Sequence, residues 1–398
     1  ILKKNKMNKF FLNLGLQPLA NNYLSNLKDK QKKYNLKLNF NTKTKLVSIS
    51  KRISSKEMFN NKYPYRSSIS QTMVDSFHKL SQEIKKKFNP KLLLEIGSND
   101  GALIKNFNKR KAIGVEPCSN LANITKSKGY KTYNKYWNFS LAKKIKNEFK
   151  SIDLIYSANT LTHISNLNEV FSSITNLLSN DGVLIIEDPS LLECIKKNAY
   201  DQFYNEHIYV FSTLSLRNIL IKHNLVIFDL KNLDTHGGSI RYYIKKKGNK
   251  NIDIKQSVKK QIFNEIKFGL NKFITFKKFA SNVKKSKHML CKLFHKIKQK
   301  NKIIAGYGAT AKSTTILNFC NINNQTINFF VDTTPDKKNK FLPGTNIKIL
   351  KYDKKLLQKV DYIFLGAWNF KKEIFRKEKK FIKNGGKFIT HVPLPLII

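Results

Sequence analysis

Three residue types that can take part in proton transfer stand close together near the middle of the chain. Tyr204, Glu206 and His207 occur within four positions, in the segment FYNEH. A tyrosine hydroxyl can donate a hydrogen bond, a carboxylate can orient an imidazole, and a neutral imidazole can accept a proton. The segment therefore predicts a general-base site. The alternative is a polar cluster that only caps the start of the next helix.

A glycine motif marks a second candidate site, in LLLEIGSNDG at residues 92–101. The apolar run predicts a buried parallel strand, and Gly97 and Gly101 predict a tight turn that brings the backbone close to a ligand. A helix is expected to begin directly afterwards, over residues 102–107. The spacing E-x-G-x-x-x-G differs from the dinucleotide fingerprint and suits a ligand without a phosphate there, such as S-adenosylmethionine. A glycine turn without any ligand is the alternative.

Polar residues at the ends of neighbouring strands extend this second site. Glu116 ends the strand predicted over residues 111–116, about twenty residues after the glycines, where an acid binds a ribose diol. Asn159 ends the strand predicted over residues 152–159, and His163 follows at the mouth of the same site, unless it is a structural histidine. We expect the cofactor to contact Glu95, Gly97, Asn99, Gly101, Glu116 and Asn159.

A sheet with strands ending at one edge must position these residues. Further strands are predicted over residues 182–188, 225–233 and 239–245. Helices are predicted between the earlier strands, over residues 120–128 and 141–149. This order resembles a class I methyltransferase domain, an α/β fold with a mostly parallel sheet and an antiparallel last strand.

The pattern restarts at residue 301 with KIIAGYGATAKSTTILNF, which predicts a strand, a G-x-G turn and a helix. Strands over residues 329–332, 361–365 and 385–391 complete a second, smaller α/β domain of nucleotide-binding type. The third glycine of the dinucleotide fingerprint is missing, so NAD is not predicted. A phosphate of another nucleotide could lie at the helix start, between Gly308 and Lys312.

The formal net charge of +49 on 398 residues admits two interpretations. One is a polyanionic partner, such as RNA or an anionic membrane. The other, which we favour, is compositional, because lysines occur in every segment and form neither an arginine-rich arm nor an RNA-binding module. We therefore predict no specific nucleic-acid partner and no membrane partner.

Other features of the composition predict a cytoplasmic protein. No apolar run reaches the roughly 18 residues of a membrane span, and polar residues interrupt the early apolar patch, so we predict no signal peptide. The four cysteines lie far apart and suit a reducing compartment. The chain starts with Ile1, and completeness of the amino terminus stays open.

Ordered motifs along almost the whole chain resemble those of the sugar C-methyltransferases that act on nucleotide-linked 4-keto deoxysugars. The matching segments are LG-x-x-PLAN, Y-x-Y-x-SS, LEIGSNDG, GVEP-x-x-N, L-x-HI-x-x-L, Y-x-EH, THGGS-x-R, GYGA-x-AK, D-x-x-P, PGT and W-N. The resemblance implies a small amino-terminal domain, a central class I methyltransferase domain and a Rossmann-like carboxyl-terminal domain. We place these over residues 1–70, 71–248 and 301–398, with connecting helices over 249–300. The family does not require a dimer, so a monomer and a homodimer are both open.

The sequence departs from that family in its leading domain, which is usually zinc-binding. Asn41 and Thr44 stand where the family has a C-x-x-C pair, and the upstream cysteine pair is missing too. An asparagine and a threonine cannot replace thiolates at zinc. We therefore predict no zinc and no other metal, a departure that bears on the stability of this domain and on activity.

The resemblance also implies roles for individual residues. His207 is the expected general base, with Tyr204 and Glu206 beside it in the motif, and His163 is the expected second polar contact. Tyr63 and Tyr65 match tyrosines that approach the sugar. The substrate's nucleotide would lie between the domains, and we expect Arg241, Gly308, Lys312 and Trp368 to contact the substrate.

The chemistry implied is carbon methylation through an enolate. A ketone at C4 acidifies the hydrogen on C3, a base removes it, and hydrogen-bond donors hold the enolate oxygen. C3 then attacks the methyl group of the sulfonium. The alternatives are a methyltransferase with another keto, oxygen or nitrogen acceptor, an RNA-binding or RNA-modifying protein, and a non-catalytic relative.

Overall fold

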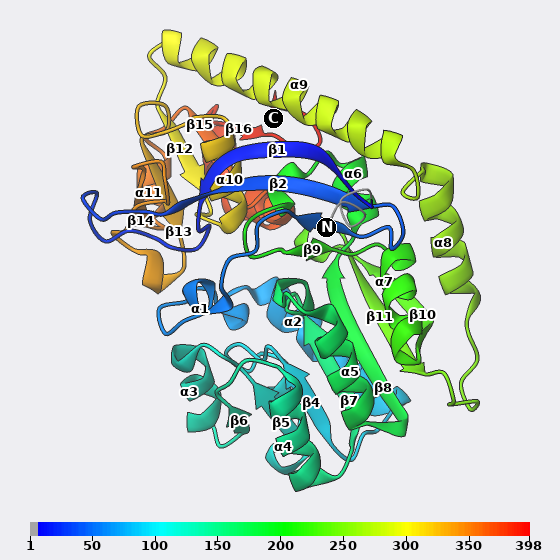
Figure 1. The fold of residues 1–398 in the computed structure, drawn as a ribbon. Coiled ribbons are helices and arrows are strands. Elements are labelled where there is room, and N and C mark those ends of the chain that lie inside the picture. Colours follow the sequence, from blue (N-terminus) through cyan, green and yellow to red (C-terminus); the bar gives the residue numbers. More distant parts are fainter. Residues whose placement is uncertain (1–6) are drawn as a thin grey trace.

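Three β-sheets organise the chain, as the ribbon in Figure 1 shows. The structure, a computed structural model, describes residues 7–398. Residues 1–6 of the predicted leading domain, and of the stretch considered for a signal peptide, lie outside the described residues.

The central sheet has seven strands in the order β10-β11-β8-β7-β4-β5-β6. Only β11 runs antiparallel to its neighbours β8 and β10. This order and direction confirm the predicted class I methyltransferase fold. The strands are β4 (Leu93–Ile96), β5 (Ala112–Val115), β6 (Lys131–Tyr133), β7 (Ile152–Ala158), β8 (Leu178–Pro189), β10 (Leu225–Leu233) and β11 (Ser239–Lys246).

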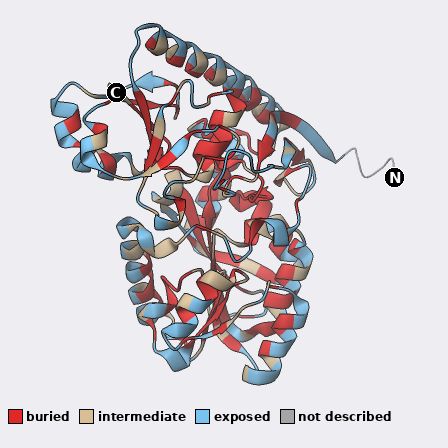
Figure 2. Ribbon diagram, turned by 90° about the vertical axis from the view of Figure 1, so that its left-hand side faces the viewer, coloured by how far each residue is buried: buried red, intermediate tan, exposed pale blue. Residues whose placement is uncertain are grey.

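Helices cover the central sheet, and their apolar sides form its core. Figure 2 shows buried residues concentrated on the strands and on the inner sides of these helices, with exposed residues outside. In α5, for example, Val170, Phe171 and Ile174 are buried. The helices are α2 (Gln71–Lys87), α3 (Ser119–Ser127), α4 (Phe139–Phe149), α5 (Leu167–Leu177), α6 (Leu191–Lys196) and α7 (Thr213–Leu220).

The helix predicted over residues 102–107 is wrong. Over these residues the structure has only a 3₁₀ turn, Ile104–Asn106. The Asn106 side chain donates to the carbonyl oxygens of Ala102 and Leu103, at 3.1 and 2.9 Å, and so competes with helical hydrogen bonds.

The amino-terminal segment forms a four-stranded antiparallel sheet. Its order is β1 (Asn8–Pro18), β2 (Lys33–Asn41), β3 (Val47–Ile49) and β9 (Tyr209–Val210). The predicted strand pair around Asn41–Lys45 corresponds to β2 and β3, whereas β1 was not predicted. The short helix α1 (Ser55–Met58) follows this sheet. Because β9 comes from the central segment, the boundaries at residues 70, 248 and 300 stay a prediction.

The carboxyl-terminal sheet is parallel except for its last strand and has the order β14-β13-β12-β15-β16-β17. Its strands are β12 (Ile304–Tyr307), β13 (Phe329–Asp332), β14 (Lys348–Lys351), β15 (Tyr362–Leu365), β16 (Lys387–Thr390) and β17 (Leu396–Ile397). Its helices are α10 (Ala311–Phe319), α11 (Lys354–Leu357), α12 (Lys371–Lys377) and α13 (Lys379–Lys383).

Two helices, α8 (Gln256–Phe268) and α9 (Phe273–Gln299), connect the central and carboxyl-terminal sheets. In Figure 1, α9 extends along one side of the molecule, beside β1 and the last domain. Phe276 of α9 stacks on Phe40 of β2, with ring centroids 4.5 Å apart, and Phe294 contacts Phe364 of β15. The helix therefore joins the first and last sheets. Within residues 7–398, no helix has the length and apolar character needed to cross a bilayer.

Candidate active site

Two adjoining cavities, of about 580 and 310 Å³, open where the carboxyl ends of the central strands face the last domain. Tyr63, Tyr65, Met73, Asn159 and His163 line both cavities, so that a ligand in one would lie next to a ligand in the other. Both volumes are in the range of small-molecule sites.

The larger cavity follows the glycine motif. Gly97 has φ +77°, and a Cβ added there would lie 2.1 Å from the Thr160 hydroxyl, so only glycine fits this turn. The Glu116 carboxylate accepts hydrogen bonds from the backbone N–H groups of Asn99 and Cys118, at 2.9 and 2.8 Å. Of the predicted cofactor contacts, the cavity is lined by Glu95, Gly97, Asn99, Glu116 and Asn159.

Gly101 does not line the cavity, which corrects its predicted contact with the cofactor. Its φ is +78°, and a Cβ there would lie 3.1 Å from a Thr125 methyl group. Its role is therefore to let the turn close against α3.

The lining of the larger cavity fits S-adenosylmethionine in charge and polarity. One carboxylate oxygen of Glu95 is buried without a hydrogen-bond partner. Burial, together with Asp100 and Glu116 nearby, raises the pKa of Glu95 well above its usual value. A cationic or hydrogen-bonding ligand would relieve this cost. Apolar walls for an adenine ring come from Phe59, Phe77, Val115 and Trp137.

His207 lines the smaller cavity, and its neighbours define its protonation. Its Nδ1 lies 2.8 Å from the Gln202 carbonyl oxygen, which can only accept, so Nδ1 carries the hydrogen. Its Nε2 therefore has a free electron pair and accepts from the Tyr204 hydroxyl at 2.6 Å. Burial lowers the pKa of His207 to about 3, although the Gln202 carbonyl opposes this effect, so the imidazole is neutral at physiological pH. A neutral imidazole is the form that can accept a proton.

Glu206 does not orient His207, in contrast to the prediction. Its carboxylate accepts from the Asn21 side chain at 2.8 Å and from the Tyr63 hydroxyl at 3.0 Å. Burial raises the pKa of Glu206 to about 7, even though both hydrogen bonds favour the charged form. Glu206 lies in a turn, closed by the His207 N–H on the Tyr204 carbonyl oxygen at 2.9 Å, and its carboxylate positions Tyr63 instead of the base.

His163 lies between Phe59 and His207, with both ring-centroid distances 5.2 Å. Its Nε2 is buried without a hydrogen-bond partner. Burial and the neighbouring His207 lower its pKa well below the usual value. His163 thus presents an unused polar atom at the junction of the two cavities.

The carboxyl-terminal domain supplies the far wall of the smaller cavity, which includes Gly308 and Lys312 as predicted. The Lys312 ammonium donates to the His236 carbonyl oxygen at 3.2 Å and to the Asn369 side chain at 3.4 Å. Burial lowers the pKa of Lys312, although Asp201 and Cys194 act in the opposite direction. An anionic ligand would stabilise this charge.

Two predicted substrate contacts lie elsewhere. Arg241 is buried outside both cavities, 2.9 Å from a Glu187 carboxylate oxygen and 3.4 Å from one of Glu83. Trp368 also lies outside the lining, because its indole N–H points to Asp201 at 2.6 Å. Both residues therefore stabilise the fold, and Asn369 lines the cavity in place of Trp368.

Several residues of the smaller cavity were not predicted from the sequence. Asn21, His236, Asp332, Lys337 and Asn369 line it. The motifs LG-x-x-PLAN, THGGS-x-R, D-x-x-P and W-N contain four of them and were the available signal. Asp332 ends β13 where a dinucleotide fold binds ribose, but its carboxylate accepts from the Ala309 N–H at 2.8 Å and from Lys337 at 3.2 Å.

The positions that correspond to zinc-binding cysteines close a turn through hydrogen bonds. The Asn41 side-chain oxygen accepts from the N–H groups of Lys43 and Thr44, at 3.0 and 2.8 Å. Lys45 follows with φ +62°. The turn between β2 and β3 is thus held by an asparagine side chain, a common way to stabilise such turns. The expected absence of zinc stays a prediction.

Two family matches divide the chain. Residues 65–230 match the family described as a methyltransferase domain, and residues 234–393 match the family described as a C-methyltransferase C-terminal domain. The C-methyltransferase NovU of Streptomyces niveus is 31% identical to this chain over 309 residues, which are 77% of this chain and 73% of that protein.

Solved methyltransferases also match, over less than half of the chain. A possible histamine N-methyltransferase of Thermotoga maritima is 21% identical to this chain. The match covers 43% of this chain and 91% of the Thermotoga protein, with a TM-score of 0.34. An S-adenosylmethionine-dependent methyltransferase of Clostridium acetobutylicum is 14% identical to this chain. The match covers 44% of this chain and 92% of the Clostridium protein, with a TM-score of 0.32.

Proposed function

Since the chain belongs to the family of S-adenosylmethionine-dependent C-methyltransferases, we propose that it methylates C3 of a nucleotide-linked 4-keto deoxysugar. The observation that carries the proposal is the free electron pair on His207 Nε2, at the wall of a cavity that adjoins the cofactor cavity. A carbon atom needs such a base before it can attack a methyl group.

In the proposed reaction, His207 Nε2 takes the proton from C3 of the sugar. The electrons of the C3–H bond form a C3–C4 double bond, and the C4 oxygen becomes an enolate. The Tyr204 hydroxyl, which donates to Nε2 in the structure, must leave that nitrogen, and it is then free to donate to the substrate. Stabilising the oxyanion in this way makes proton removal next to a ketone accessible at neutral pH.

Tyr63, Tyr65 and His163 would place the sugar between the two cavities. All three line both cavities, and Tyr63 is held by Glu206. When bound, S-adenosylmethionine supplies an electrophilic methyl group on sulfur. Holding C3 close to that methyl group accounts for much of the rate expected of such a site.

The nucleotide would lie against the carboxyl-terminal domain. Lys312 is a buried cation with only neutral oxygens within hydrogen-bond distance, and it stands at the start of α10, whose backbone N–H groups also attract anions. A diphosphate near Gly308 and Lys312 would be held by both. The side chain of Lys312 would then fix the sugar's position relative to His207.

The test is a transfer assay with isotopically labelled S-adenosylmethionine and thymidine-diphospho 4-keto-6-deoxysugars, with NMR assignment of the methylated carbon. We expect label on C3. Label on an oxygen, a nitrogen or another carbon would contradict the proposed substrate position and would favour a different acceptor.

Further predictions stay part of this proposal. We propose a cytoplasmic enzyme with the four segments 1–70, 71–248, 249–300 and 301–398, which acts as a monomer or homodimer without zinc. The four cysteines, Cys118, Cys194, Cys291 and Cys320, are free thiols in the structure, which is consistent with a reducing compartment.

A further inference from the structure

The main-chain carbonyl of Gln202 determines which nitrogen of His207 carries the hydrogen. It accepts from Nδ1 at 2.8 Å and leaves Nε2 without a hydrogen, so that Nε2 accepts from the Tyr204 hydroxyl at 2.6 Å at the cavity wall. If the carbonyl turned away, Nδ1 would lose its acceptor and the hydrogen could occupy Nε2 instead. A neutral imidazole with its hydrogen on Nε2 cannot accept a proton there. The conformation of the turn that contains Gln202 therefore bears directly on the base.

That turn is the 3₁₀ turn η5 (Tyr200–Gln202), and each of its residues is attached to another part of the chain. The Tyr200 hydroxyl lies 3.4 Å from the Ser286 hydroxyl of α9. The Gln202 amide donates to the His236 carbonyl oxygen at 2.5 Å. Asp201 makes the attachments that lie deepest, since it is fully buried.

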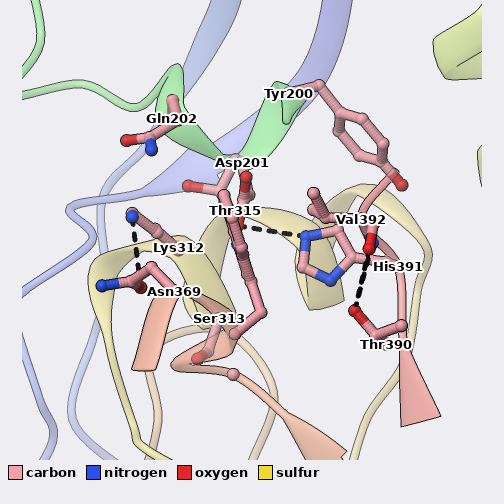
Figure 3. A network of polar contacts seen from close by, with 12 residues as sticks. Tyr200, Asp201, Gln202, Lys312, Ser313, Thr315, Asn369, Thr390, His391 and Val392 are labelled. Carbon is pink, nitrogen blue, oxygen red and sulfur yellow. Dashed lines mark hydrogen bonds and ion pairs between the residues drawn. The ribbon is translucent and has the colours of Figure 1, made fainter. Parts of the chain in front are cut away.

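Asp201 connects the turn to two residues of the carboxyl-terminal domain. Its Oδ2 accepts from the Trp368 indole N–H at 2.6 Å and lies 3.0 Å from Nε2 of His391. Figure 3 shows Asp201 on its turn, with Lys312 on one side and His391 on the other. Burial opposes ionisation of Asp201, but His391, Lys312 and Trp368 together hold its pKa below the usual value. The turn therefore carries a buried carboxylate that depends on partners from the last domain.

We infer that Asp201 is a positioning residue for the base: by binding Trp368 and His391, it holds the turn whose next carbonyl fixes the tautomer and direction of His207. The inference rests on the proposed function of His207. It gives the carboxyl-terminal domain a part in proton transfer in addition to nucleotide binding. It also explains why Trp368, which was expected to contact substrate, points its N–H away from the cavity.

Replacing Asp201 should shift the turn that holds His207 without preventing cofactor or substrate from binding. In Asp201→Asn, the amide oxygen can accept from Trp368 in place of Oδ2, but the negative charge beside His391 is lost. The N–H₂ group then takes the place of Oδ1, which is buried without a hydrogen-bond partner, so the turn has to shift to satisfy this donor. Small shifts of catalytic groups cost up to about 100-fold in rate. The cavity linings for cofactor and nucleotide do not include Asp201.

The first test observes His207 without any substrate. Nitrogen-15 NMR of the histidine side chains reports which ring nitrogen is protonated, and the signal of His207, one of eight histidines, is identified by its absence in His207→Gln. We expect the Nδ1–H form in the wild-type protein and in Tyr200→Phe, a control in the same turn. Asp201→Asn should contain a measurable fraction of the Nε2–H form. A wild-type pattern in Asp201→Asn would overturn the inference.

The second test uses kinetics with the sugar substrate. We expect Asp201→Asn to lower kcat about 10- to 100-fold, with KM and S-adenosylmethionine affinity within about twofold of wild type. In the His207→Gln background the same change should add no further loss. An equal loss in both backgrounds would show a general structural role and overturn the inference.

A second variant covers the case in which Asp201→Asn does not fold, and the activity of the wild-type protein tests the proposed function separately. If Asp201→Asn does not fold, Trp368→Phe removes the indole donor and leaves the carboxylate in place, and the same shift in the His207 signal is expected. A wild-type signal there would again overturn the inference. Failure of the wild-type protein to methylate the sugar would contradict the proposed function, while the NMR result would still decide the role of Asp201.

Discussion

Burial prepares the side chains around His207 for opposite roles. It keeps His207 neutral, with a pKa of about 3, and it raises the pKa of Glu206 to about 7. The two residues are adjacent in sequence, yet the imidazole contacts Gln202 and Tyr204 while the carboxylate contacts Asn21 and Tyr63. One residue is thus available to accept a proton, and the other holds a tyrosine at the junction of the cavities.

Glu206 should make the stability of the protein depend on pH. Its pKa is about 7 in the folded protein against 4.5 ordinarily, so between these values the folded state holds a proton that the unfolded chain has released. Its contribution to stability is therefore present below about pH 4.5 and is lost as the pH rises through 7. As the pH rises from 5 to 8, we therefore expect the free energy of unfolding of Glu206→Gln to increase by about 1–3 kcal/mol relative to that of the wild type.

Urea unfolding of both proteins at several pH values measures this difference. Glu57→Gln is the control, because it makes the same chemical change at a carboxylate that is 41% exposed. A difference between wild type and Glu206→Gln that stays the same from pH 5 to pH 8 would show that Glu206 titrates normally.

At the scale of elements, the turn after β4 depends on one glycine. Gly97 combines φ +77° with a close approach to Thr160, whereas Gly15 in β1 has φ +79° and open space around its Cα. Alanine at either position destabilises the folded protein by roughly 1 kcal/mol or more, because an alanine disfavours the left-handed conformation. Only at position 97 does the methyl group also collide with a neighbour.

We therefore expect Gly97→Ala to lose at least about tenfold in S-adenosylmethionine affinity, because the turn that lines the cavity must move. Gly15→Ala should lose stability alone. Isothermal titration with S-adenosylmethionine and thermal unfolding measure the two effects. Wild-type affinity in Gly97→Ala would mean that this turn does not shape the cofactor site.

The strands that carry the cofactor site could be predicted because they are buried on both faces. Segments such as β4 and β7 are mostly apolar and are followed by polar residues, a pattern typical of buried parallel strands. In β1, by contrast, Phe10 and Leu16 are more than half exposed, so apolar residues do not mark an inward face. The strands β6 (KTY) and β14 (KILK) were missed because lysines leave no apolar run longer than two residues in either of them.

The long-range contacts around the proposed base could not be predicted from the sequence. Glu206 meets Asn21 across 185 positions, and Asp201 meets Trp368 across 167. Neither pair leaves a periodic pattern in the sequence. Local spacing suggested that Glu206 serves its neighbour His207, but the fold directs the two side chains to different partners.

At the scale of the whole molecule, the amino-terminal, central and carboxyl-terminal parts of the chain contribute to one site. The smaller cavity is lined by Asn21 from the amino-terminal segment, His207 from the central segment and Lys312 from the last domain. The molecule also carries 75 basic and 26 acidic residues, so most of its cations lack a carboxylate partner. Such a surplus of one charge destabilises a compact state through self-repulsion.

Added salt should therefore stabilise the folded protein. Raising NaCl from about 20 to 200 mM shortens the screening length from roughly 20 to 7 Å, which weakens repulsion between exposed lysines. We expect Tm to rise by several degrees over this range, with KCl giving the same result. An unchanged or falling Tm would indicate that the surplus charge is already balanced in the fold.

Exchange of the C3 hydrogen tests the central claim, that His207 generates an enolate, most directly. The protein is incubated in heavy water with a thymidine-diphospho 4-keto-6-deoxysugar and without a methyl donor, and the sugar is analysed by mass spectrometry and NMR. We predict that the wild type incorporates one deuterium at C3 and that His207→Gln, although it still binds S-adenosylmethionine, does so at least about 100-fold more slowly. Equal exchange by both proteins would contradict the assignment of His207 as the base.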